Sequence, residues 1–262
     1  MKANTRHLLF TIVLAATLAA CGSMKSGSDA PAAKASGGGN LAAALAQADR
    51  PAEDKTRDAD RKPAELMEFF GVKPGMTTVD LIALGGYVTE VLSVTVGPKG
   101  KVYAQNPPVA LQLRDGMYAK QITERLANNR LPNVVRVDAD LPASSQIAPG
   151  SVDVAITMMN YHDVRNRNPD DGVTVLKAVY TMLKPGGVLG VTDHVGNDGA
   201  NNAQLHRIPK HFLIDDAKAA GFTVEAESDV LAHAADDHTK VVFDPTLRGK
   251  TDQFVVRLRR PK

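Results

Sequence analysis

The chain has little of several residue types that commonly reveal a function. Of its 262 residues one is cysteine and none is tryptophan, and aromatic residues make up 5%. A single cysteine excludes an intramolecular disulfide and a cysteine-based metal site. Basic and acidic residues are nearly balanced, at 31 and 29. Because that balance gives no overall attraction to polyanions, composition predicts no nucleic-acid partner.

The longest apolar run lies at the amino terminus. Lys2 and Arg6 precede the run at residues 8–16, and small residues follow up to Cys21. This is the charge, core and cleavage-site layout of a secretory signal, and the run is too short to cross a bilayer as a mature helix. Residues 18–21, Leu-Ala-Ala-Cys, resemble the lipobox of bacterial lipoproteins, in which the signal is cleaved before the cysteine and the cysteine is acylated.

The lipobox resemblance predicts a location. Several acyl chains on Cys21 would anchor the protein to a membrane, since each buried methylene contributes about 0.8 kcal/mol. Gly22 follows, and by resemblance to lipoprotein sorting the lack of aspartate there favours the periplasmic face of the outer membrane. The alternative is an ordinary secretory signal with an incidental cysteine. Cleavage removes two basic residues and no acidic one, which leaves 29 of each.

The rest of the chain predicts one domain. Residues 1–20 form the signal peptide, residues 21–50 a lipidated cysteine and a flexible linker rich in Gly, Ser and Ala, and residues 51–262 a domain long enough for one core. That domain alternates strand-like and helix-like segments, as βαβ proteins do. After a first strand near residue 80, further strands are predicted at residues 101–105, 134–137, 152–157, 188–192, 222–228 and 254–258. Between the fourth and fifth of these seven strands, Asp170 or Asp171 is expected to cap a helix that ends in a stop and turn at residues 184–187.

Residues 78–90 read as a buried strand, a tight loop and a helix. Asp80 lies near the carboxyl end of the strand, and Gly85 and Gly86 turn the chain into the helix. In open α/β sheets ligands bind at this edge, because helix amino termini point unpaired N–H groups into the crevice. Alternatively, Asp80 only caps the helix and the glycines only make the turn. No Gly-x-Gly-x-x-Gly follows the strand, which disfavours a nicotinamide dehydrogenase.

Several segments in order resemble the class I methyltransferases that use S-adenosylmethionine. The resemblance runs from about residue 61 to the end, and its segments are residues 75–80, 101–104, 137–142, 151–155 and 183–191. More narrowly, Asn160-Tyr-His-Asp163 with Asp193-His194 resembles a branch of predicted bacterial methyltransferases. The resemblance implies a Rossmann-like α/β fold, a mostly parallel seven-stranded sheet with helices on both faces, S-adenosylmethionine as cofactor, and a small-molecule methyl acceptor that the sequence does not identify.

The resemblance also assigns residues to the cofactor. The cofactor-binding positions it implies are Asp80, Gly85, Gly86, Asn106, Asp138 and Asn160. Asn106 stands where the family has an acid for the ribose hydroxyls, and Asp138 matches the acid near the adenine amino group. Ile82 and Leu84 stand where the family's Asp-x-Gly-x-Gly-x-Gly pattern has its first two glycines. Side chains there restrict the backbone and crowd a ligand that approaches it.

A polar rim forms the second candidate site. Its residues follow the fourth and fifth strands and are Tyr161, His162, Asp163, Asp193 and His194. We expect Tyr161 and His162 to position or deprotonate the acceptor, with His206, Asp237 and His238 reaching the same mouth from later loops. The alternative is that these His and Asp residues hold loops together. These side chains can also form part of a metal site, but no zinc-ligand spacing is evident, so the sequence assigns no metal ligand.

The leading interpretation is a lipid-anchored methyltransferase that acts mainly by proximity and orientation. The first alternative is a non-catalytic envelope lipoprotein with a degenerate methyltransferase fold. It is favoured by the compartment, because S-adenosylmethionine is made in the cytoplasm. A metal-assisted hydrolase built on the His/Asp rim is a third interpretation. The sequence indicates no oligomeric state.

Overall fold

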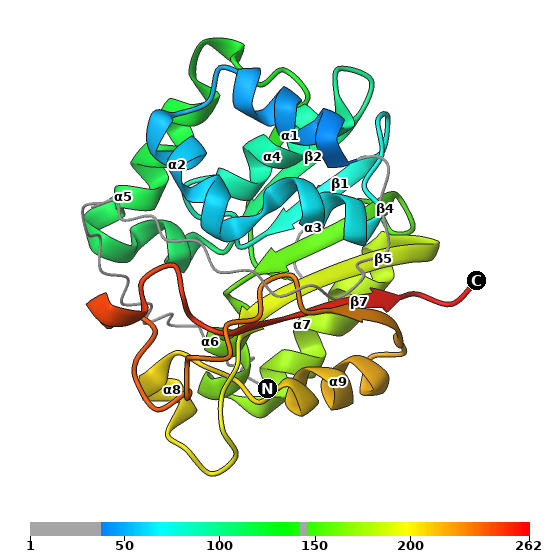
Figure 1. Cartoon of the computed structure of the whole chain (residues 1–262). Helices are drawn as coiled ribbons and strands as arrows, with labels where there is room; N and C mark the ends of the chain where they lie inside the picture. Colours follow the sequence, from blue (N-terminus) through cyan, green and yellow to red (C-terminus); the bar gives the residue numbers. More distant parts are fainter. Residues whose placement is uncertain (1–37, 142–145) are drawn as a thin grey trace.

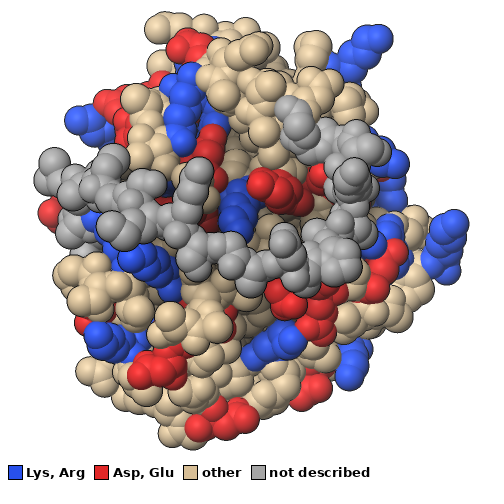
Figure 2. Space-filling view, viewed as in Figure 1, with Lys and Arg blue, Asp and Glu red and all other residues tan. Residues whose placement is uncertain are grey.

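The computed structural model of the chain describes residues 38–141 and 146–262 (Figure 1). The predicted signal peptide at residues 1–20 and the predicted lipidation site Cys21 lie outside the described residues. Within the described part of the chain, no helix combines the length and apolar character needed to cross a membrane. On the face seen in Figure 2, basic and acidic side chains are interspersed, as the balanced charge predicts.

One seven-stranded sheet organises the described residues, in the order β3-β2-β1-β4-β5-β7-β6. The strands are β1 (Thr77–Leu81), β2 (Lys101–Asn106), β3 (Val134–Asp138), β4 (Val152–Met158), β5 (Leu183–His194), β6 (Thr223–Ser228) and β7 (Gln253–Arg259). The first five pair in parallel, whereas β7 runs antiparallel to both β5 and β6. This confirms the predicted Rossmann-like α/β fold with a mostly parallel sheet.

Helices cover both faces of the sheet. They are α1 (Gly38–Gln47), α2 (Ala52–Arg61), α3 (Pro63–Phe70), α4 (Tyr87–Val96), α5 (Pro108–Leu126), α6 (Tyr161–Arg167), α7 (Pro169–Met182), α8 (Asn202–Leu205) and α9 (Lys210–Ala219). Figure 1 shows α1 to α4 on one side of the sheet and α7 and α9 on the other. Short 3₁₀ turns occupy Ala127–Asn129 and Pro245–Leu247.

Side chains of alternating strand residues pack into two apolar cores, one on each face of the sheet. Val154 and Ile156 of β4 pack toward α3 and α4, whereas Ala155 between them packs toward α7 and α9. This two-residue alternation is what a strand buried on both faces produces. Leu45 of α1 is buried in the first core, so α1 packs onto the domain although the sequence analysis assigned it to the linker.

Most predicted elements are present, with three differences. The cap of α7 is Asn168, whose side chain accepts a hydrogen bond from the Asp170 amide at 3.2 Å, so the predicted capping by Asp170 or Asp171 is wrong. Residues 184–187, predicted as a helix stop and turn, belong to β5. Helix α2 was not predicted, because its sequence is almost entirely polar and has no apolar periodicity.

Candidate active site

The loop between β1 and α4 keeps the backbone of a glycine-rich loop without most of its glycines. Ile82, Leu84 and Gly86 have φ angles of 55°, 50° and 84°, so every second residue is left-handed. These are the positions where the class I pattern has glycine. A left-handed conformation costs an L-residue roughly 1–2 kcal/mol, and a β-branched residue such as Ile82 rarely adopts it. The chain therefore retains the loop's shape at an energetic cost.

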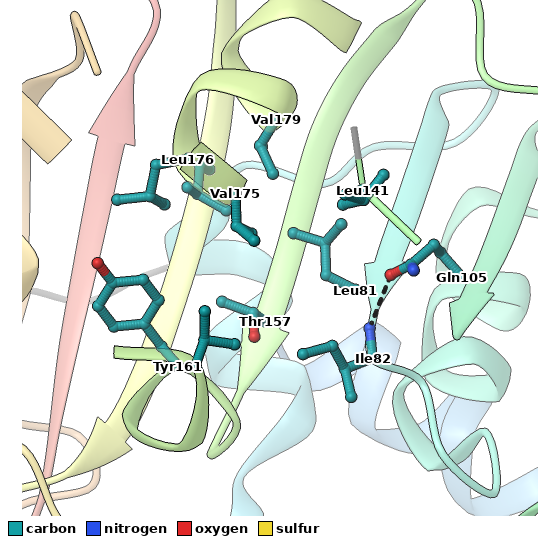
Figure 3. Close-up of a pocket in the computed structure, with 11 residues that line it drawn as sticks. Leu81, Ile82, Gln105, Leu141, Thr157, Tyr161, Val175, Leu176 and Val179 are labelled. Carbon is teal, nitrogen blue, oxygen red and sulfur yellow. Dashed lines mark hydrogen bonds between the residues drawn. The ribbon is translucent and has the colours of Figure 1, made fainter. Parts of the chain in front are cut away.

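Three side-chain amides hold this loop in place. Gln105 Oε1 accepts a hydrogen bond from the Ile82 amide at 3.2 Å (Figure 3), and Asn106 Oδ1 accepts one from the Leu84 amide at 2.7 Å. From the other side, Asn160 Nδ2 donates to the Ile82 carbonyl at 3.3 Å. Asn106 is fully buried. The structure therefore uses its amide inside the loop and does not present it on the wall of the large cavity described below.

The side chains of Ile82 and Leu84 fill the space between the segments that follow β2 and β4. They form a small apolar cluster with Ala110 and Val164. Next to it lies a small cavity of about 20 Å³, lined mainly by apolar side chains of α6, α7 and the end of β1 (Figure 3). That volume is about enough for one water molecule. A cofactor could enter this region only if the cluster moved.

A much larger cavity, of about 860 Å³, opens beside the same loop. Its walls combine the loop with α2 and with residues that follow β4 and β5. Among the lining residues are Asp80, Gly85, Arg61, Asn160, His162 and His206. Ligand sites commonly measure about 300–1,000 Å³. The cavity is therefore the candidate site, and three of the six predicted cofactor positions (Asp80, Gly85 and Asn160) line it.

Asp80 is a buried carboxylate at the edge of this cavity. Its Oδ2 accepts a hydrogen bond from the Thr89 hydroxyl at 2.6 Å. Burial raises the pKa of Asp80 to about 7, and the hydrogen bonds from Thr89 only partly oppose this. The charged form of Asp80 is therefore poorly stabilised by the protein alone, and a cation in the cavity would stabilise it.

Gly86 is required by its backbone and by the packing of α5. Its φ is 84°, and a Cβ atom there would lie 2.7 Å from Cδ1 of the fully buried Ile122. At Gly85 a Cβ atom would meet the end of the exposed Gln121 side chain, which can move away. The carbonyl of Gly85 accepts a hydrogen bond from Arg125 Nε at 2.6 Å. Both glycines therefore lie against α5, but only Gly86 excludes a side chain.

Arg61, at the carboxyl end of α2, is a cation on the cavity wall. Its guanidinium carbon lies 4.6 Å from the ring centroid of Tyr87, the first residue of α4. Burial lowers the pKa of Arg61 to about 10, which leaves it charged at neutral pH. Arg61 forms no hydrogen bond or ion pair with another described residue, whereas nearby Arg57 pairs with Asp54 at 3.3 Å.

A cluster of histidine and aspartate side chains lies on another part of the cavity wall. His162 Nδ1 lies 2.6 Å from Asp193 Oδ1. On the other edge of its ring, His162 Nε2 lies 3.4 Å from Asp163 Oδ1, and His206 Nδ1 lies 3.3 Å from the same oxygen. His162 and Asp163 lie in the first turn of α6, Asp193 is the penultimate residue of β5, and His206 follows α8, so three segments converge here as predicted.

Burial and charge set the protonation of this cluster. Burial acts to lower the pKa of His162, but Asp193 and Asp163 outweigh it and the pKa is raised. Burial likewise opposes ionisation of Asp193, but His162 and the backbone amides lower its pKa. His194 behaves differently, because burial lowers its pKa to about 3 and keeps the ring neutral.

Tyr161 and Asp138 lie away from the large cavity. The Tyr161 hydroxyl donates to Asp216 Oδ2 of α9 at 2.7 Å, and burial raises the pKa of Tyr161. The phenol therefore serves the packing of α6 on α9 rather than facing an acceptor. Asp138 is exposed and pairs with Arg136 at 2.8 Å. Of the two predicted catalytic residues, only His162 lines the cavity.

Two histidines from the later loops lie in different places. His206 lies beside His162, with ring centroids 5.6 Å apart, as the sequence analysis expected. His238 instead joins Asp252, with Nε2 2.9 Å from its carboxylate. The sequence analysis missed Arg61, and the available signal was its spacing from Arg57, since residues four apart share one helical face.

Comparison with solved structures places the fold in the class I methyltransferase group. A methyltransferase from Aquifex aeolicus that depends on S-adenosylmethionine matches with a TM-score of 0.57 at 20% identity, over 80% of this chain and 98% of that chain. An arsenic(III) S-adenosylmethionine methyltransferase from Chlamydomonas reinhardtii matches with a TM-score of 0.53 at 19% identity, over 85% of this chain and 73% of that one.

The [4+2]-cyclase SpnF matches equally well, with a TM-score of 0.57 at 16% identity over 78% of this chain and 81% of that chain. No protein-family model matches the chain, and no curated protein matches it in sequence. At these identities the similarity shows that the chain has the class I methyltransferase fold. Because one of the matched structures is a cyclase, the reaction must be argued from the site.

Proposed function

We propose that the 860 Å³ cavity binds S-adenosylmethionine, and that the protein transfers its methyl group to a small acceptor. The observation that carries this proposal is Arg61, a half-buried guanidinium that lines the cavity beside the amino terminus of α4 and pairs with no described acid. A helix amino terminus and an arginine together favour a carboxylate, and the amino-acid part of the cofactor carries one.

The residues of the cavity fit the amino-acid part of the cofactor. Arg61 and the first turn of α4 would hold its carboxylate. Asp80 would pair with its ammonium group, which supplies the cation that the raised pKa of this carboxyl calls for. The ribose end fits less well, because Asn106 is buried and bonded to Leu84. The protein would therefore hold the ribose without the family's acidic residue.

The acceptor would lie toward His162. Asp193 holds Nδ1 of this ring, which leaves Nε2 on the side of Asp163 and the cavity. An oriented imidazole can accept a proton from an acceptor or hold it in place. Bound S-adenosylmethionine would supply an activated methyl group, and the chain's own contribution would be to orient the acceptor and exclude water.

Calorimetry on the full-length protein in mild detergent tests the proposal. We expect S-adenosylmethionine and its demethylated product to bind, and Arg61→Gln to weaken binding about tenfold or more, because a hydrogen bond to a charged group contributes about 1.5–3 kcal/mol. Arg57→Gln is the matched control, since Arg57 lies on the same helix and near the same ring but is already paired. Absence of heat with millimolar ligand would refute the proposal.

A non-catalytic binding protein is the second candidate, and two observations favour it. The side chains of Ile82 and Leu84 fill the space beside the loop that they belong to, and the Asn106 side chain is hydrogen-bonded to the backbone of that loop. On this account the protein binds a ligand in the cavity but transfers no methyl group. Binding of the demethylated product with an affinity that Arg61→Gln does not change, together with no labelled methyl transfer to cell-envelope extracts, would support this candidate instead.

We also propose that the protein is a lipoprotein anchored through Cys21 to the periplasmic face of the outer membrane. The support is the order of basic residues, apolar run and lipobox at residues 1–21. Labelling with a radioactive fatty acid should mark the wild-type protein and leave Cys21→Ser unlabelled. A Cys21→Ser variant that still carries label and fractionates with membranes would refute the anchor.

A further inference from the structure

We propose that His162, Asp163 and His206 form a binding site for a first-row divalent transition metal ion, with Zn²⁺ as the reference ion. The sequence shows no zinc-ligand spacing and assigns no metal ligand, and His206 is distant from His162 and Asp163 in the chain. The fold brings them together, and one ligand atom from each residue lies within 4.8 Å of the others.

The distances suit a tetrahedral ion. Ligand atoms that each lie about 2.1 Å from a tetrahedral metal are separated from one another by about 3.4 Å. His162 Nε2 and Asp163 Oδ1 are 3.4 Å apart, and His206 Nδ1 and Asp163 Oδ1 are 3.3 Å apart. Two of the three edges thus match this separation, and the third, between the two rings, is at most 4.8 Å. A small rotation of one ring would complete the arrangement.

Asp193 orients His162 in the way that supports a metal ligand. Its carboxylate lies 2.6 Å from His162 Nδ1 and also accepts the backbone amides of His162 and His194, both at 2.8 Å. A carboxylate on one ring nitrogen fixes the tautomer and turns the other nitrogen toward the ion. Asp193 is fully buried, so this support is rigid.

His206 provides the independent observation. Its Nδ1 is buried and has no hydrogen-bond partner among the described residues. An unsatisfied buried polar atom is costly and calls for an explanation. His206 also has a left-handed backbone, with φ of 54°, and its ring packs against Phe243 with centroids 4.8 Å apart. The left-handed backbone is that of the residue that caps α8. The fold thus places this ring beside Asp163 with a buried nitrogen that makes no hydrogen bond to a described residue, and a metal ion would satisfy that nitrogen.

The ligand set selects the class of ion. Two imidazole nitrogens and one carboxylate oxygen suit Zn²⁺ and other first-row transition ions, whereas Ca²⁺ and Mg²⁺ prefer oxygen ligands. All three residues also line the large cavity. A coordination position would therefore remain open to water or to an oxygen or nitrogen atom of a small molecule. An ion on His162 Nε2 would occupy the lone pair that the proposed function assigns to the acceptor's proton, so the metal-bound site would hold the acceptor through the open coordination position instead. The proposed cofactor contacts, Arg61 and Asp80, are not among the three metal ligands.

The test is metal binding by the full-length protein in detergent after treatment with a chelator. Calorimetry with Zn²⁺ alone should show one equivalent, confirmed by elemental analysis, and Co²⁺ should give the visible absorption of a low-symmetry site. Asp163→Asn and His206→Gln should each weaken Zn²⁺ affinity at least about a hundredfold, because loss of an orienting partner alone costs 10–100-fold. Asp193→Asn, which removes only the orienting carboxylate, should weaken the Zn²⁺ affinity about 10–100-fold.

His211→Gln is the matched control. His211 also faces an aspartate, Asp198, at 3.6 Å, but on the surface, where both side chains are at least half exposed. Unchanged affinity in this variant supports the proposal. Absence of stoichiometric metal in the wild type would overturn it, as would full affinity in His206→Gln with unchanged circular dichroism. A separate titration of the metal-free protein with S-adenosylmethionine shows whether the proposed function stands when the metal site fails.

Discussion

The side-chain amide of Asn106 is bonded to the backbone of Leu84, with Asn106 Oδ1 2.7 Å from the Leu84 nitrogen. This contact joins the end of β2 to the loop after β1, and it fixes a left-handed leucine at a position where related loops have glycine. Because Asn106 is fully buried and does not line the large cavity, its amide does not face a ligand bound there. The contact therefore holds the loop after β1 in its left-handed shape.

The strain at Leu84 predicts a small cost for its replacement by glycine. Leu84→Gly loses apolar packing but relieves a left-handed backbone worth roughly 1–2 kcal/mol. Leu113→Gly is the matched control, because Leu113 belongs to the same apolar cluster and is likewise half-buried but has φ of −58°. Urea unfolding should show a free-energy loss about 1–2 kcal/mol smaller for Leu84→Gly. Equal losses would show that the loop is unstrained.

The same replacement predicts a gain in cofactor affinity. Leu84→Gly restores one glycine of the pattern and removes a side chain from the cluster with Ile82. We expect S-adenosylmethionine to bind several-fold more tightly to this variant than to Leu113→Gly, measured by calorimetry. An affinity that does not change would mean that the side chain at position 84 does not obstruct the ligand.

Asp80 predicts a pH dependence of stability. Burial raises its pKa in the folded state to about 7, above the value of an exposed aspartate, so the folded protein binds more protons than the unfolded chain between about pH 4 and 7. The contribution of Asp80 to stability is present below pH 4 and is lost as the pH rises to 7, at up to about 1.4 kcal/mol per unit. Relative to the wild type, Asp80→Asn should therefore gain stability between pH 5 and 8. A difference in unfolding free energy that is the same at both pH values would contradict this.

We expect the Glu90→Gln variant, which removes the charge of Glu90, to lose much of the protein's free energy of unfolding. The buried carboxylate of Glu90 forms ion pairs with Arg125 and Arg130. Loss of one partner of a buried pair leaves uncompensated charge and costs about 3–5 kcal/mol. Glu124→Gln is the control, because Glu124 pairs with Lys120 at 3.8 Å on an exposed surface, where pairs contribute about 0–1 kcal/mol. Similar unfolding free energies for the two variants would rule out the buried network as a stabilising element.

Tyr161 predicts a change in stability without a change in binding. Tyr161→Phe removes the hydrogen bond to the Asp216 carboxylate, which is ion-paired with Arg165, and loss of a hydrogen bond to a charged group costs about 1.5–3 kcal/mol. The hydroxyl faces α9 rather than the large cavity, so the affinities for S-adenosylmethionine and Zn²⁺ should stay within about twofold, a change of about 0.4 kcal/mol. A tenfold loss of either affinity would instead support the catalytic role that the sequence analysis assigned to this residue.

The sequence was sufficient to predict the fold because each strand carries its own signal. The β-branched runs, proline starts and glycine stops are local features, and α3 between Pro63 and Gly71 follows them closely. The site was less predictable. Whether Asn106 faces a ligand or the loop depends on a backbone contact 22 residues away, and no local pattern reports it. Helix α2, which carries Arg61, has no apolar periodicity and so escaped prediction.

A crystal structure of the protein with the demethylated cofactor would test the central claim most directly. We expect the ligand in the 860 Å³ cavity, with its carboxylate in ion-pair contact with Arg61 and its ammonium group against Asp80. A cavity that stays closed to the ligand at saturating concentration, or a ligand bound with its carboxylate away from Arg61, would contradict the account.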